Sequence, residues 1–116
     1  MYTIYYEFTH LNDYINAERG SWRAASKIKK RETSIVQYEL MNKTPFKTPC
    51  KIKFTWLIKN NRVDADNRAW SKKMILDGMV KAHILPDDSM KYVIGFVDEF
   101  EISDKVGVRI ERIEEE

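Results

Sequence analysis

The stretch Lys51-Ile52-Lys53-Phe54-Thr55-Trp56-Leu57-Ile58 decides the fold of this chain. Apolar residues at even positions alternate with polar residues at 51, 53 and 55, which predicts a strand with one face in the core. A polar turn over 59–63 follows, and the chain then reaches Asp64 and Asp66. A strand that ends just before two aspartates places them at the edge of a sheet, where open α/β folds hold ligands.

The segments before this strand predict one strand and a long helix. Residues 2–8 are rich in β-branched and aromatic side chains and predict a strand, followed by a short helical or irregular segment over 10–18. Ser21 is a suitable N-cap for a helix that continues to about Met41. The apolar positions expected on the packed face of this helix are Ala25, Ile28, Ile35 and Tyr38.

The segments after it predict a helix and two strands. A helix over 66–82 is expected, with Asp66 or Asn67 as its cap. Residues 92–97 are apolar on both faces, which is typical of a central strand, and a last strand covers 106–110 before an acidic tail at 114–116 that we expect to fray. The order is β-α-β-α-β-β. We therefore predict an α+β (α/β) fold in a single domain, 1–116, with helices packed on a small mixed sheet.

Composition and length restrict the class of protein. The chain has 116 residues, 43% hydrophobic and 33% charged, which fits one folded domain rather than a disordered chain. Its longest apolar runs are too short for a bilayer, and the first residues lack a signal-peptide core. Cys50 is the single cysteine, and we expect a buried structural thiol in a reducing cytoplasm. No phosphate loop, zinc signature or nucleophile elbow is present.

Basic residues are concentrated in one part of the chain although the net charge is only +2. Residues 19–31 contain no acid, which suggests a surface for a polyanion. The residues predicted to contact such a polyanion are Arg19, Arg23, Lys27, Lys29, Lys30 and Arg62. The plainer interpretation is a solvated helix face. Trp22 within this run either stacks on a base or packs in the core.

Acidic residues suggest a second kind of site. If Asp64, Asp66 and Asp88 cluster, their charges need compensation, and Mg²⁺ or Mn²⁺ bound by hard oxygen ligands supplies it. Along the helix expected over 66–82, Lys73 and Asp77 share one face with Asp66 and Trp70. The short turn after this helix can return Asp88 to Asp64 and Asp66. Each residue also has an ordinary explanation, as a cap, an exposed ion pair or a turn residue. An EF-hand is disfavoured because the required glycine is missing.

Taken in order, these residues resemble a known family. Asp64-x-Asp66-Asn67, a helical lysine, Asp77-Gly78 and Leu85-Pro86-Asp87-Asp88 are similar to the RusA family of phage and prophage Holliday-junction resolvases. The run Leu11-Asn12-Asp13-Tyr14-Ile15, with Arg19 and Lys27-Ile28-Lys29-Lys30 after it, resembles the opening of many members. The resemblance covers nearly the whole chain.

The resemblance implies a homodimeric endonuclease that requires Mg²⁺, or Mn²⁺ as a substitute, and cuts branched DNA, above all four-way junctions. It implies cytoplasmic action in a bacterial host, in a phage or prophage context, without a membrane. Asp64, Asp66 and Asp88 correspond to the metal-binding catalytic carboxylates, and Lys73 to the catalytic lysine. The residues with possible supporting roles are Asn67, Asp77 and Asp87.

The chain departs from the family pattern at several positions. Lys73 lies seven residues after Asp66, where the best-studied form has four, so Lys72 is an alternative catalytic lysine. Val63 stands where an arginine is expected, which suggests a shifted role for Arg62, and His83 replaces a common glycine. Two other functions therefore stay open. One is a non-catalytic DNA- or junction-binding protein with a degenerate metal site, and the other is a structural interaction protein.

Overall fold

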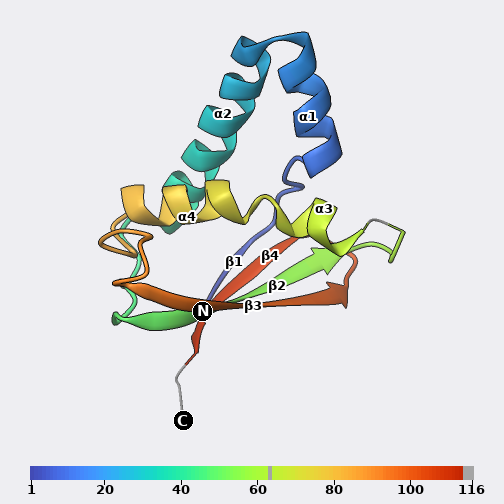
Figure 1. Ribbon diagram of the computed structural model, residues 1–116. Helices are drawn as coiled ribbons and strands as arrows, with labels where there is room; N and C mark the ends of the chain where they lie inside the picture. Colours follow the sequence, from blue (N-terminus) through green and yellow to red (C-terminus); the bar gives the residue numbers. More distant parts are fainter. Residues whose placement is uncertain (63, 114–116) are drawn as a thin grey trace.

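A four-stranded mixed sheet forms the base of the molecule, and the helices lie on one of its faces (Figure 1). The computed structural model describes residues 1–62 and 64–113. The elements in chain order are β1 (Tyr2–Ile4), α1 (Leu11–Gly20), α2 (Trp22–Leu40), β2 (Cys50–Ile58), α3 (Ala65–Ala69), α4 (Lys72–Lys81), β3 (Val93–Ile102) and β4 (Gly107–Ile113). The α+β class and the mixed sheet predicted from the sequence are confirmed.

Strand β2 forms where the alternating pattern predicts a strand, and it lies inside the sheet between β4 and β3. The strand order is β1-β4-β2-β3, with β2 parallel to β3 and antiparallel to β4. Ile52, Phe54 and Trp56 are at most 1% exposed and face the helices. Ile110 of β4 is fully buried beside Phe54, so the two central strands share one apolar layer.

The prediction that residues 92–97 form a central strand is wrong. β3 is an edge strand that extends to Ile102, and the side chains of Ile94 and Phe96 are each 45% exposed. The run is apolar on both faces, but β3 pairs only with β2 among the described strands. The other edge of β2 pairs with β4. The first strand is also shorter than predicted and ends at Ile4, although Phe8 remains buried.

Helix α2 begins and packs largely as the sequence predicts. The Ser21 hydroxyl accepts a hydrogen bond from the Arg23 backbone N–H at 3.1 Å, which is an N-cap contact. Ala25 is buried, but the expectation for Tyr38 is wrong, because its side chain is 74% exposed. The packed face instead continues through Thr33, Val36 and Leu40 toward α4 and the core.

Helices α2 and α4 approach each other closely at Gly78. A Cβ placed there would lie 2.4 Å from the Val36 Cβ and 2.8 Å from the Thr33 carbonyl oxygen. Only a residue without a side chain permits this contact at the present helix spacing. Gly78 therefore fixes how near α4 lies to α2, and so where the side chains of α4 lie.

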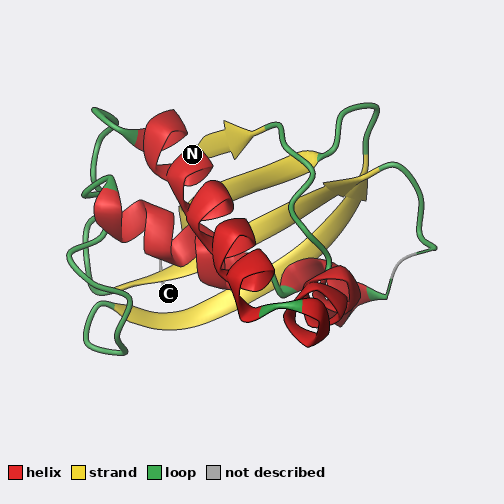
Figure 2. Ribbon diagram, turned by 90° about the horizontal axis from the view of Figure 1, so that it is seen from above, coloured by secondary structure: helices red, strands yellow, loops and turns green. Residues whose placement is uncertain are grey.

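Helices α1 and α2 form a hairpin that rises away from the sheet (Figure 1). Seen from above, the helices lie over the strands (Figure 2). The hairpin is fixed near its base by Glu32, which is fully buried and accepts hydrogen bonds from the Thr9 backbone N–H at 2.9 Å and the Thr9 hydroxyl at 2.6 Å. Two contacts from one carboxylate hold the β1–α1 connection against α2.

Two smaller predictions concern Cys50 and membrane segments. Cys50 is 3% exposed, as expected for a structural thiol, and burial raises the pKa of this thiol while the charge of Arg112 opposes that shift. Within residues 1–62 and 64–113, no helix is both long and apolar enough to span a membrane. The acidic tail at 114–116 lies outside the described residues.

Candidate functional site

The single helix predicted over 66–82 is two helices, α3 and α4, separated by Trp70 and Ser71. The Trp70 ring packs on Tyr14 of α1, with their centroids 4.5 Å apart. Ser71 is fully buried, and its hydroxyl donates to the Arg68 carbonyl oxygen at 3.2 Å. The predicted stripe from Asp66 through Trp70 to Asp77 is therefore interrupted, because tertiary packing of Trp70 and Ser71 ends the first helix.

Asp64 and Asp66 lie at the beginning of α3 and are exposed. Asp64 occupies the N-cap position without a side-chain capping bond, so the prediction that Asp66 or Asn67 is the cap is wrong. The described residues offer neither carboxylate a hydrogen bond or ion pair. Asn67 has a structural contact instead, since its Oδ1 accepts from the Asn12 backbone N–H at 2.9 Å and joins α3 to α1.

Lys73 is the centre of a second group of charges. Its Nζ lies 3.1 Å from Asp77 Oδ1 and 3.7 Å from Asp88 Oδ2. The hydrogen bond that Lys73 donates to Asp77 is the main cause of its raised pKa, and the negative charges of Asp77 and Asp88 add to it against some desolvation. Lys73 is therefore firmly cationic at neutral pH.

Lys72 faces a different part of the molecule. Its Nζ lies 2.6 Å from Asp98 Oδ2 of β3 and 4.7 Å from the centroid of the Phe96 ring. Asp98 also accepts a hydrogen bond from the Trp56 indole at 3.0 Å. Of the two lysines considered from the sequence, Lys73 is the one that stands beside Asp88, while Lys72 ties α4 to the edge strand.

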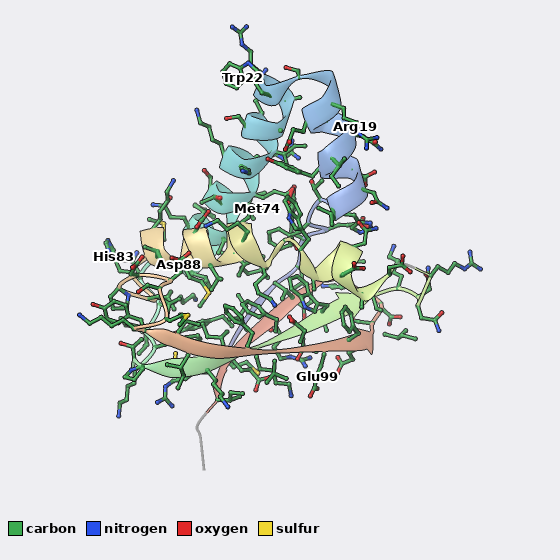
Figure 3. All side chains as sticks on the ribbon, viewed as in Figure 1. Arg19, Trp22, Met74, His83, Asp88 and Glu99 are labelled. Carbon is green, nitrogen blue, oxygen red and sulfur yellow. The ribbon has the colours of Figure 1, made fainter. Side chains whose placement is uncertain are left out.

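His83 makes the turn that brings Asp88 back along α4. It has a left-handed backbone with φ of 63°, and its N–H donates to the Val80 carbonyl oxygen at 3.0 Å. The Ile84 N–H donates to the Met79 carbonyl oxygen at 2.9 Å, which completes a Schellman-type helix end. Glycine commonly holds this position, and His83 adopts the same conformation. Asp88 consequently lies beside α4 (Figure 3).

The three predicted metal ligands are not assembled into one group. Among residues 1–62 and 64–113 there is no group of three or more His, Cys, Asp or Glu side chains that could hold a metal ion. The charge of Asp88 is compensated by Lys73, whereas Asp64 and Asp66 have no such partner among the described residues. Mg²⁺ often takes one or two carboxylates and completes its shell with water and substrate phosphate. The Asp64 and Asp66 pair fits part of such a site, and Asp88 as placed does not complete it.

Basic side chains of α2 meet the acidic group across an open hollow of about 350 Å³. Lys29 and Lys30 line one side, and Asp77, Asp87 and Asp88 line the other. These two lysines are among the residues that the sequence predicts to contact DNA. The carboxylates across the hollow would repel a phosphate bound by these lysines. A cation that screens the carboxylates would therefore strengthen phosphate binding.

The remaining predicted DNA contacts lie elsewhere on the surface. Arg19 and Trp22 are at the far end of the helical hairpin (Figure 3). Trp22 is 71% exposed, so it is not a core residue, and the Arg23 guanidinium lies 5.6 Å from its ring centroid. Lys27 is exposed on α2, and Arg62 is exposed in the connection between β2 and α3. Val63, whose identity suggested a shifted role for Arg62, lies outside the described residues.

Two residues with unusual environments were not predicted from the sequence. Arg68 is 5% exposed on α3, and burial lowers its pKa while the charge of Glu7 partly restores it. The Nε2 atom of His10 is buried without a hydrogen-bond partner among the described residues. The sequence gives no sign that Arg68 is buried. An arginine two residues after Asp66, near the beginning of a helix, is ordinarily expected to be exposed.

Comparisons with models of protein families, with curated proteins and with solved structures find no match for this chain. The likeness to RusA resolvases therefore depends on the quoted residues and on their order alone.

Proposed function

We propose that this protein is a structure-specific DNA endonuclease that cuts four-way junctions by phosphodiester hydrolysis, in the manner of the RusA family. The observation that carries the proposal is the return of Asp88 to within 3.7 Å of Lys73, beside a hollow that also holds Lys29 and Lys30. A lysine next to clustered acids and a basic helix is an arrangement suited to a phosphate backbone and a cation together.

The cation in this proposal is Mg²⁺, with Mn²⁺ as a substitute, and Asp64 and Asp66 would hold it. When bound, such an ion lowers the pKa of water and neutralises charge on the attacked phosphate. Lys73 supplies a fixed positive charge that is 60% exposed and can therefore be reached by a phosphate oxygen. Asp77 and Asp88 hold the Lys73 ammonium in position until the substrate arrives.

The basic surface of α2 would position the DNA. Lys29 and Lys30 contact phosphates near the hollow, and Arg19 and Arg23 contact the backbone at the end of the hairpin. The exposed Trp22 ring is free to stack on a base, which is most accessible where strands separate at a branch. The proposal includes a homodimer, because two identical sites related by a two-fold axis match opposed strands of a junction.

A second function is favoured by one specific observation. The described residues contain no group of three acids that could hold a metal ion, and Asp88 is paired with Lys73. A protein that binds junctions without cutting them would need the basic surface but not the metal site. We therefore keep non-catalytic junction binding as the alternative.

One experiment separates the two functions. A synthetic four-way junction, end-labelled on each strand in turn, is incubated with the protein in the presence and absence of Mg²⁺, beside a linear duplex of the same sequence. Paired nicks in the junction that depend on Mg²⁺ support the endonuclease. Tight junction binding without nicks in Mg²⁺ or Mn²⁺ supports the alternative. If the protein binds neither DNA, both proposals are wrong.

A further inference from the structure

A second, smaller hollow lies between the β1–α1 connection, the end of β2 and α3. Its volume is about 140 Å³, and its polar lining comes from Glu7, His10, Lys59, Asn60 and Arg68. Four of these five side chains can donate hydrogen bonds, and Glu7 is the single carboxylate among them. The hollow is thus predominantly a collection of donors.

Two of these donors are buried and lack an acceptor. Within the described part of the chain, Arg68 Nε and His10 Nε2 have no hydrogen-bond partner. Glu7 Oε1 lies 3.9 Å from an Arg68 terminal nitrogen and 4.0 Å from His10 Nε2, distances beyond a hydrogen bond. The Glu7 side chain is 66% exposed, whereas that of Arg68 is 6% exposed. Buried polar atoms in native proteins are nearly always paired, so these two need a partner from beyond the described residues.

We propose that this hollow binds a tetrahedral oxyanion, namely a phosphate group of the DNA backbone. A guanidinium presents two parallel N–H groups that match two phosphate oxygens, and the His10 ring can supply a third donor at Nε2. Arg68 is held almost entirely out of water, which is costly for a guanidinium unless an anion compensates it. The charge of Glu7 lowers the cost of burying the Arg68 guanidinium, but at 3.9 Å Glu7 is too far away to accept a hydrogen bond from it.

The position of Arg68 in the chain favours a DNA phosphate over free phosphate. Arg68 and Asp66 belong to the same short helix, and Lys59 and Asn60 precede Asp64 by a few residues. A backbone phosphate held here would bring the bound DNA strand to α3, the helix whose beginning carries the two exposed aspartates. This part of the inference rests on the proposed function, whereas the anion site itself does not.

The first test uses inorganic phosphate and requires no DNA. Phosphate is titrated into the ¹⁵N-labelled full chain, and NMR follows the Arg68 Nε–H signal and the His10 ring. We expect saturable shifts at both groups. Glu7→Gln should bind phosphate severalfold more tightly, because it removes a competing negative charge from the mouth of the hollow.

The controls separate a specific site from a general charge effect. Glu101→Gln makes the same change of charge in a surface pair with Arg109, 3.3 Å away, and should leave phosphate affinity unchanged. Arg68→Lys keeps the charge but loses the fork and should weaken phosphate binding by roughly tenfold or more, as expected for one charge-assisted hydrogen bond. If Arg68→Lys does not fold, His10→Ala serves the same purpose at the neighbouring donor, with a smaller loss expected.

The second test measures junction affinity in Ca²⁺, a condition chosen to prevent cleavage. Arg68→Lys, or His10→Ala in its place, should weaken binding of a four-way junction by about the same factor as it weakens phosphate binding. Absence of phosphate binding in both the wild type and Glu7→Gln would overturn the anion site. Phosphate binding with unchanged junction affinity would overturn the DNA assignment and leave a free-phosphate site. A protein that never cuts DNA would still show the phosphate shifts, so failure of the proposed function is distinguishable.

Discussion

The two groups of aspartates in this protein differ in what balances their charge. Asp64 and Asp66 are exposed at the beginning of α3, without a cationic partner among the described residues. Asp77 and Asp88 share Lys73, whose Nζ lies 3.1 and 3.7 Å from them. A carboxylate already paired with an ammonium group gains less from a metal ion than an unpaired one. The comparison supports the proposal that a cation binds at α3, while the Lys73 group contributes a fixed charge.

Replacing an aspartate of the unpaired group should have the largest effect. We expect Asp64→Asn or Asp66→Asn to lower junction cleavage by at least ~1,000-fold, because a metal ion contributes several kcal/mol of transition-state stabilisation. Junction affinity in Ca²⁺ should stay close to that of the wild type. Asp88→Asn should also abolish cleavage if Asp88 joins the metal when DNA is bound. Near-normal turnover in Asp88→Asn would mean that only the α3 pair holds the ion.

The two neighbouring lysines offer a matched pair for the next test. Lys73→Ala should lower the cleavage rate by at least ~100-fold, a common loss for one electrostatic stabiliser. Lys72→Ala should change the rate by only a few-fold but lower the melting temperature, since Lys72 connects α4 to Asp98 of β3. Single-turnover cleavage and thermal unfolding measure the two effects. A large rate loss in Lys72→Ala with normal Lys73→Ala would reverse the assignment.

The basic surface should influence binding rather than chemistry. Replacing Lys27, Lys29 and Lys30 with glutamine should weaken junction affinity and reduce the slope of log affinity against log salt by about 0.9 for each phosphate that is no longer neutralised. Since Lys29 and Lys30 line the hollow beside Asp88, they should account for more of the loss than Lys27. Lys105→Gln, in the connection between β3 and β4, is the control. An unchanged slope in the triple variant would show that this surface faces away from DNA.

The turn that returns Asp88 to Lys73 can be strengthened. His83 has a left-handed backbone, a conformation that costs a residue with a side chain about 1–2 kcal/mol. Glycine avoids this cost, but it loses more conformational entropy on folding, which cancels part of the gain. We expect His83→Gly to raise the free energy of unfolding by about 1 kcal/mol, measured by chemical denaturation. His83→Ala should not stabilise the protein, because alanine keeps the strain. Equal effects of both variants would argue against the backbone explanation.

The smallest expected effect concerns the pKa of Lys73. Asp77→Asn should lower this pKa more than Asp88→Asn does, because the hydrogen bond to Asp77 is its main cause. The raised pKa contributes stability below the pKa of the unfolded lysine, and this contribution is lost as pH rises through the folded value. Solvent screening keeps the gain small, since Lys73 is 60% exposed. NMR of the lysine side chain measures the shift, with Asp87→Asn as the control.

Sequence patterns predicted the elements whose signals are local. The alternation over 51–58 identified a strand, and Ser21 marked the beginning of α2, because both signals depend on neighbours within a few residues. The short turn after α4 was expected to return Asp88 to Asp64 and Asp66, but among the described residues it returns Asp88 to Lys73 instead. For the candidate site, helical spacing grouped Lys73 with Asp77, and their charged groups lie 3.1 Å apart.

Tertiary structure alone decided burial, edges and charge pairing. Nothing local distinguishes an edge strand from a central one, so β3 was misplaced, and Tyr38 was assigned to a packed face that other helices do not cover. Helix α3 ends before Trp70, whose ring packs on Tyr14, a residue far away in the sequence. Arg68 is likewise buried by residues far away in the sequence, since it lines the same hollow as His10. Periodicity shows which side of a helix or strand is apolar, but the element that covers this side comes from a distant part of the chain. The charge that neutralises an acid can come from a distant part as well.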